Sequence, residues 1–229
     1  MRGKRARVQI GYYPGYSTLA QQAFWDEATR KVVLKRLEPP PALRFFGPAE
    51  AERMEAVCQR ILPQEDRPED RRIAIVAGID RRLAEGRGNG YRYADMPPDG
   101  EAHRMGLRAI EEISQCLLGR EFVRLGGRER DEVLFTLHDG APPAAHAIFA
   151  RMGVRHYWLM LVNDVVSEYY AHPWAWDEIG FGGPAYPRGY MRLERGEPEP
   201  WERREQRYAW SAPADSLSGE FRPLPGGQL

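Results

Sequence analysis

The side chains best suited to proton transfer or metal binding lie near the end of the longest helical pattern in the chain. Glu168 and His172 are four residues apart, and Asp177 follows them. A carboxylate beside an imidazole can act as a general acid–base pair, and both groups bind metal ions. A histidine at a helix end often has a capping or packing role instead. The three residues therefore support one hypothesis, a stand-alone helical enzyme or small-molecule binder, beside a purely structural alternative.

The other motifs predict no cofactor site in this chain. Gly86, Gly88 and Gly90 follow a predicted helix and precede a predicted loop, whereas a dinucleotide-binding glycine motif lies between a strand and a helix. No Glu-x-x-His occurs, although a di-iron helical bundle requires it. The remaining histidines lack the spacing of metal ligands: His103, His138, His146 and His156. We therefore expect this chain to bind no flavin, haem or metal.

The two cysteines, Cys58 and Cys116, are far apart in the sequence, and each lies on an apolar stripe. No Cys-x-x-Cys pair and no zinc-ligand spacing is present. Both are predicted to be buried free thiols, with a disulfide to another chain as the alternative.

A second candidate site is the aromatic segment HPWAWDEIGFGGPAYPRGYMRL, residues 172–193. Its prolines and glycines predict irregular backbone. Tryptophan, tyrosine and arginine are enriched at protein interfaces, so the segment is a candidate for docking a partner. The alternative is that it folds back over the helices of its own chain, because large rings usually become buried. The candidate interface residues are Trp174, Trp176, Phe181, Tyr186, Arg188 and Tyr190.

The elements that position these residues are helices. Apolar residues recur at helical spacing in nearly every segment, and no segment alternates as a strand does. Trp158 and Tyr169 share the stripe of the last long helix and are predicted to lie in the core. Six to seven helices are expected, and the main segments are 17–37, 48–62, 75–83, 101–118, 128–138 and 144–170, the last broken or bent near Gly153.

This pattern predicts an all-α fold with a single helical domain. We expect a helical N-terminal extension over residues 1–43, the domain over 44–195, and an extended polar arm over 196–229. The arm is rich in proline, glycine and charge, and it lacks the apolar residues of a core.

Composition excludes several functional classes. The chain has 33 lysines and arginines and 33 aspartates and glutamates among 229 residues, so no basic field predicts nucleic-acid binding. No apolar run approaches the length of a membrane span, and no signal peptide is recognisable. We therefore expect a cytoplasmic protein, or a periplasmic one only if a partner carries the export signal.

Four segments resemble a known family in the same order along the chain. They are RFFGPAEAERMEAVCQRILPQ (44–64), AGIDRRL (77–83), GLRAIEEISQCLLGREFVRL (106–125) and RDEVLFTLHDG (130–140). The aromatic C-terminal segment EYYAHPWAWDEIGFGGPAYPRGYMRL also fits. Together they are similar to the gluconate 2-dehydrogenase subunit 3 family.

The resemblance implies a small, non-catalytic subunit. Members of the family accompany a large FAD-dependent oxidoreductase of the glucose-methanol-choline type, often with a multihaem cytochrome c as electron acceptor. They are thought to stabilise the large subunit or assist its maturation or export. The implied substrates are sugars, sugar acids or related alcohols, and the implied location of FAD is the partner.

The chain departs from the family pattern at both ends. It starts MRGKRAR where family members often have a twin-arginine leader, and its tail is longer and more polar than the pattern requires. Besides the stand-alone enzyme, a helical scaffold for an unrelated partner is the remaining alternative.

Overall fold

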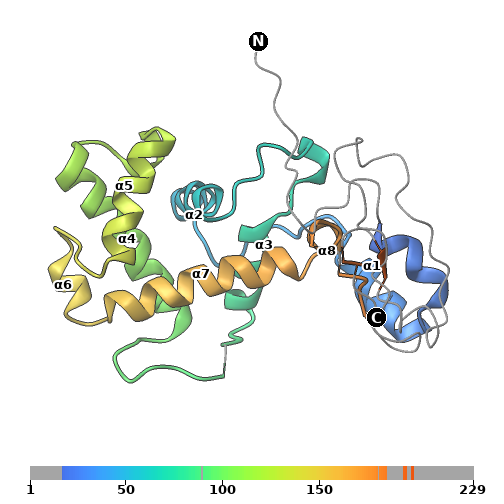
Figure 1. Cartoon of the computed structure of the whole chain (residues 1–229). Helices are drawn as coiled ribbons and strands as arrows, with labels where there is room; N and C mark the ends of the chain where they lie inside the picture. The colour runs from blue at the N-terminus through green and yellow to red at the C-terminus, as the bar shows by residue number, and fades with distance from the viewer. Residues whose placement is uncertain (1–16, 89, 180, 185–192, 195–196, 199–229) are drawn as a thin grey trace, which may run out of the picture. The chain divides into compact units, whose positions relative to one another are not determined.

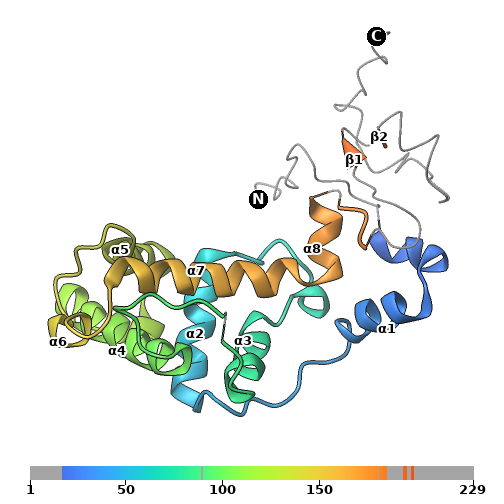
Figure 2. The ribbon, with the colours of Figure 1, turned by 90° about the horizontal axis from the view of Figure 1, so that it is seen from below.

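The computed structural model describes residues 17–88, 90–179, 181–184, 193–194 and 197–198. The fold is all-α, as predicted, with eight α-helices in these residues (Figures 1 and 2). The chain divides into two compact units. The second unit is the continuous segment Pro40–Tyr169, whereas the first combines the described residues up to Pro39 with those from Tyr170 onward.

The second unit contains six α-helices and two short 3-10 helices. Helix α2 packs against α3, α4 and α5, and α6 packs against α4. Both views show α6 beside the first turn of α7, the long helix of the unit (Figures 1 and 2). The elements are α2 (Pro48–Ile61), η2 (Glu69–Arg71), α3 (Ile75–Ala84), α4 (Asp99–Leu118), η3 (Phe122–Arg124), α5 (Gly127–His138), α6 (His146–Phe149) and α7 (Val154–Tyr170).

Local sequence explains where several of these helices begin and end. Pro48 occupies the first turn of α2, where its missing N–H costs nothing. The Glu50 carboxylate accepts a hydrogen bond from the Gly47 N–H (3.0 Å), and Glu129 accepts one from Gly126 (2.8 Å) at the start of α5. Gly119 ends α4 in the left-handed region at φ 64°. The predicted break of the last long helical segment is confirmed by the gap between α6 and α7.

The core of the second unit is formed by the inward faces of these helices. Its fully buried side chains include Met54, Phe122, Met105, Leu107, Ile110, Ile113, Leu137 and Leu161. Tyr157 of α7 lies directly on α4, because a Cβ added at Gly106 would stand 1.9 Å from its ring. Gly106 therefore permits the close approach of the two helices.

The first unit joins the two ends of the described chain. It contains η1 (Thr18–Phe24), α1 (Glu27–Lys35), α8 (Pro173–Glu178) and the antiparallel pair β1 (Leu193–Glu194) and β2 (Glu197–Pro198). Trp25, Val33 and Trp176 form its buried cluster, with Leu19 and Phe181 packed against it.

Hydrogen bonds tie the two ends together. The Thr18 N–H donates to Asp177 Oδ1 (2.6 Å), and the Thr18 hydroxyl donates to the Phe181 carbonyl (3.0 Å). Arg36 Nη1 donates to the carbonyl oxygen of Ala171 (2.6 Å). Segments that are distant in sequence therefore share one small core.

Two helix predictions were wrong in detail. The expected helix over 17–37 is η1 followed by α1, because Asp26 starts a new helix by accepting a hydrogen bond from the Thr29 N–H (2.8 Å). Trp174 and Trp176 lie on the short helix α8 rather than on irregular backbone. Pro173 begins that helix, since proline is favoured in a first turn.

Burial also differs from the prediction at two positions. Cys58 is buried as expected, but Cys116 is exposed near the end of α4. Trp158 is only half-buried, whereas Tyr169 lies in the core. The expected domain over 44–195 stays a prediction, and the described residues from Tyr170 onward group with the N-terminal segment.

Candidate functional site

The three residues of the catalytic hypothesis are divided between the units. Glu168 belongs to the second unit, where a Cβ added at Gly78 would stand 2.1 Å from its Oε2. The carboxylate therefore lies directly on the α3 backbone. Burial raises the pKa of Glu168, whereas the nearby Arg81 and Arg82 guanidinium groups act in the opposite direction.

His172 and Asp177 have structural roles in the first unit. His172 is the N-cap of α8, where its Nδ1 accepts a hydrogen bond from the Trp174 N–H (3.2 Å). Its ring also contacts the Trp174 ring, with 4.5 Å between centroids. Asp177 accepts the hydrogen bond from Thr18. These contacts agree with the structural alternative. Within the described ranges, no group of three or more His, Cys, Asp or Glu residues is placed to hold a metal ion.

The aromatic segment is partly folded into the first unit. Trp176 is 6% exposed, and its Nε1 donates to the Tyr170 carbonyl (2.6 Å). The Phe181 ring meets Trp176 edge-on at 5.5 Å, and the Arg36 guanidinium lies 5.5 Å from the Trp176 ring centroid. Trp176 is thus a core residue, which favours the folded-back alternative for this ring. Trp174 and Phe181 are half-buried, while Tyr186, Arg188 and Tyr190 lie outside the described residues.

A buried polar network between α3, α4 and α7 was not predicted. Arg82 donates from Nη1 to Asp99 Oδ2 (2.7 Å) and from Nη2 to Asp164 Oδ2 (2.5 Å). The same Asp164 oxygen lies 2.8 Å from His103 Nε2. The His103 side chain is 0% exposed and that of Asp164 is 3% exposed. A His–Asp pair resembles a general base, but no substrate reaches an imidazole that is completely enclosed.

Two polar atoms beside this network have no hydrogen-bond partner among the described residues, namely His103 Nδ1 and Tyr157 Oη. The two rings are 6.5 Å apart between centroids. Burial raises the pKa of the Tyr157 hydroxyl, and the neighbouring Asp164 raises it further. Burial also raises the pKa of the Cys58 thiol, so Cys58 is an unreactive side chain of the core.

Asp80 is a second buried carboxylate, and backbone N–H groups donate hydrogen bonds to it. It is 1% exposed and accepts hydrogen bonds from three successive backbone N–H groups, those of Arg44 (2.7 Å), Phe45 (2.8 Å) and Phe46 (2.8 Å). It therefore fixes the segment that leads into α2. A charged residue on the apolar stripe of 75–83 was the only sequence signal for this role.

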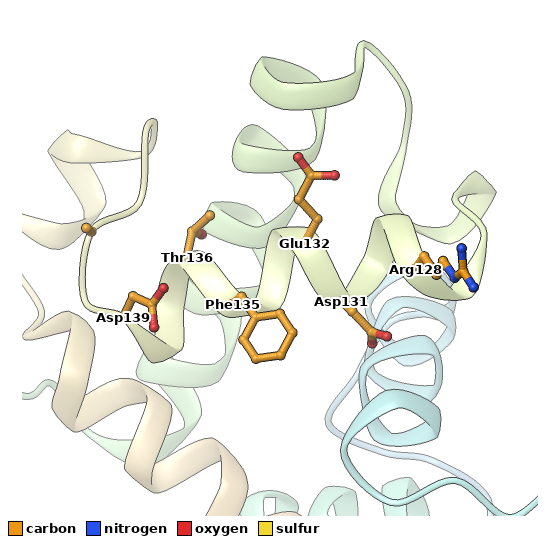
Figure 3. Close-up of a pocket in the computed structure, with 7 residues that line it drawn as sticks. Arg128, Asp131, Glu132, Phe135, Thr136 and Asp139 are labelled. Atoms are coloured by element: carbon orange, nitrogen blue, oxygen red, sulfur yellow. The ribbon is translucent and has the colours of Figure 1, made fainter.

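The solvent-facing side of α5 carries a pocket of about 480 Å³. Figure 3 shows Phe135 between Asp131 and Asp139 along the helix, with Glu132 and Thr136 in the neighbouring row. Phe135 is 61% exposed. No sequence pattern indicated this surface, because Phe135 is not among the inward positions of its helix and lies outside the aromatic segment. The lining residues are Arg128, Asp131, Glu132, Phe135, Thr136, Asp139 and Ala141.

Comparison with protein families decides the classification. The family model for gluconate 2-dehydrogenase subunit 3 matches residues 48–183, more than half of the chain. The chain belongs to this family. No curated protein matches it, and no solved structure does.

The subunit 3 match begins at the first residue of α2 and extends past the end of α8. It includes the buried polar network and the α5 pocket, but it excludes η1 and α1. The residues that bury Trp176 in the first unit, Trp25 and Val33, therefore come from outside the family region. In the described part of this family member, no helix is both long enough and apolar enough to cross a bilayer.

Proposed function

We propose that this chain is a non-catalytic small subunit that binds and stabilises a FAD-dependent dehydrogenase of the glucose-methanol-choline type. The substrates of the complex are sugars, sugar acids or related alcohols, and FAD is bound by the large subunit. A cytochrome c subunit is the proposed electron acceptor. The observation that carries the proposal is the family match over residues 48–183, since the family is named for subunit 3 of gluconate 2-dehydrogenase.

The roles of the candidate catalytic side chains support this proposal. His172 caps a helix, Asp177 binds the Thr18 backbone, and Glu168 lies against the α3 backbone. In the described interior of the second unit, His103 Nε2 lies 2.8 Å from Asp164 Oδ2. The core encloses both side chains. Because these residues have structural roles, they give little support to the hypothesis of a stand-alone enzyme.

The test is co-expression of the tagged chain with a FAD-dependent dehydrogenase from the same genome. We expect the two proteins to elute together, with flavin absorbance in the complex and dye reduction when a sugar or sugar acid is added. The chain purified alone is expected to be colourless and to reduce no dye.

Two results would contradict the proposal. Stoichiometric flavin in the isolated chain, or turnover by it, would overturn the non-catalytic role. Failure of the chain to associate with the dehydrogenase, while it captures a different protein reproducibly, would favour a helical scaffold for an unrelated partner.

A further inference from the structure

We infer that η1 and α1 form an intramolecular cover over the surface by which this chain binds the dehydrogenase subunit. That surface, called the α8 surface below, consists of Trp176 of α8 and the following Phe181 and Gly183. The cover is the segment from Thr18 to Lys35. The inference rests on the proposed function, because it identifies where the dehydrogenase binds and what regulates that binding.

Apolar contacts define what the α8 surface accepts. Trp25 and Val33 of the cover belong to one buried cluster with Trp176, and they are 4% and 1% exposed. Val33 therefore lies on the inward side of α1, whereas the neighbouring Val32 is 56% exposed. A surface covered in this way is suited to the apolar face of a helix, which is a common mode of protein recognition.

Polar contacts and a glycine add to the fit of the cover. The Thr18 N–H donates to Asp177 Oδ1 (2.6 Å), and the Thr18 hydroxyl donates to the Phe181 carbonyl (3.0 Å). Gly183 has a φ of 82°, and a Cβ added there would stand 2.6 Å from Thr18 Cγ2. The α8 surface thus offers hydrogen-bond acceptors beside its aromatic rings.

The family match separates the α8 surface from its cover. The match spans residues 48–183, so it includes the whole α8 surface and excludes both elements of the cover. The family is named for a subunit of gluconate 2-dehydrogenase. A partner common to the family is expected to bind within the family region. The α8 surface belongs to that region, and the segment that occupies it here does not.

Two features make the cover releasable. Trp25 Nε1 is buried and has no hydrogen-bond partner among the described residues, so the covered state contains an unsatisfied donor. Residues 38–43, which follow the cover, are exposed and belong to no helix or strand. Asp80 binds the backbone of the next segment, Arg44–Phe46, so the second unit retains its first residues when the cover leaves.

The cover and the dehydrogenase compete for the same surface. Binding of the dehydrogenase requires release of the cover, so the apparent Kd equals the intrinsic Kd divided by the uncovered fraction of the chain. A substitution that opens the cover should therefore lower Kd, although it adds no contact with the partner.

The first test measures the affinity of full-length variants for the purified dehydrogenase subunit. Val33→Asp places a carboxylate in the buried cluster and should release the cover, so we expect Kd to fall about 10-fold. Val32→Asp introduces the same side chain at the exposed neighbouring position of α1 and should leave Kd unchanged. The two variants have the same charge and the same helix propensity.

A second substitution locates the binding surface. Phe181→Ala removes a half-buried ring of the α8 surface, and in the Val33→Asp background it should raise Kd about 10-fold. Leu159→Ala removes an apolar side chain of α7 that is 55% exposed in the second unit. In the same background this control should leave Kd unchanged.

Hydrogen exchange of the wild-type chain gives a measurement that needs no variant, so it decides the question even if Val33→Asp fails to fold. The amides of α1 should lose protection when the dehydrogenase subunit binds, while those of α4 and α8 keep theirs. Unchanged or increased protection of α1 in the complex would overturn the inference.

The outcomes distinguish the cover from the proposed function. If the wild-type complex forms, Val33→Asp binds like Val32→Asp and α1 stays protected, the cover is refuted while the subunit role survives. If neither the wild type nor Val33→Asp forms a complex, both proposals fail. If Val33→Asp instead forms a dimer of this chain in sedimentation, a second copy occupies the α8 surface and the inference is overturned.

Discussion

The aromatic rings of the first unit and the ring at the centre of the α5 pocket have opposite environments. Trp25 and Trp176 are 4% and 6% exposed, whereas Phe135 is 61% exposed. Trp176 comes from the proline- and glycine-rich aromatic segment and Trp25 from the segment 17–37 that was predicted to be one helix, whereas the exposed ring comes from α5. The tryptophan-rich segment therefore contributes a ring to a core, whereas a single apolar ring on the polar face of a helix is ordinary surface composition.

The largest expected effect tests the buried side of this comparison. Trp176→Ala removes a ring that contacts Phe181 and donates a hydrogen bond to Tyr170, so we expect it to destabilise the first unit by about 3–5 kcal/mol. Limited proteolysis should then cut the described part of that unit while residues 40–169 stay resistant. Trp174→Ala, at a half-buried ring of the same helix, is the control with a smaller loss. Equal protease resistance of the Trp176 variant and the wild type would show that the ring is not part of a core.

The next effect concerns the buried carboxylate of the second unit. Asp80→Ala leaves three backbone N–H groups without their acceptor, and we expect a loss of about 3 kcal/mol in the free energy of unfolding. Denaturant titration measures it. Glu50→Ala removes the exposed acceptor of one N–H group at the start of the adjacent helix, and its cost should stay near about 1 kcal/mol. Similar losses for the two variants would contradict the assigned role of Asp80.

A smaller effect depends on pH. The pKa of Glu168 is raised above its ordinary value of 4.5, so protonation stabilises the folded state. This contribution is fully present below the unfolded pKa and is lost as pH rises through the folded pKa. Glu168→Gln stays neutral, so the variant should gain stability relative to wild type as pH rises above about 4.5. Urea titrations between pH 4 and pH 8 test this, and a relative loss of stability with rising pH would be the opposite sign.

The smallest expected effect sharpens the exposed side of the comparison. Phe135→Ala removes a ring that is mostly in solvent, so the free energy of unfolding should change by about 0.5 kcal/mol or less. A thermal melt of the isolated chain measures it. A loss comparable with that of Trp176→Ala would mean that Phe135 supports the fold.

Much of the helical framework could be predicted from local sequence. Apolar spacing together with Pro48, Gly119 and Gly153 located four helices of the second unit and the break before α7. These signals act over a few residues. The split at Asp26 and the start of α8 at Pro173 are also local, but the aromatic composition around them obscured the capping residues.

The candidate site was less predictable, because it depends on which residues neighbouring helices cover. Arg82, His103 and Asp164 meet from three helices, and no periodicity links residues 61 or 82 positions apart. Cys116 lies on the apolar stripe of α4 but near its end, where it is exposed. Phe135 occupies a position that α5 turns toward solvent.

The pairing of Thr18 with Asp177, 159 residues apart, has a consequence for synthesis of the protein. The second unit is one continuous segment, so it can fold as soon as Tyr169 has left the ribosome. Trp25 and Val33 are made first, yet the partner ring Trp176 is translated long after them. These early residues must wait, uncovered, for nearly the whole chain to emerge. Since contacts between such distant residues form slowly, we expect the first unit to complete its folding after the second.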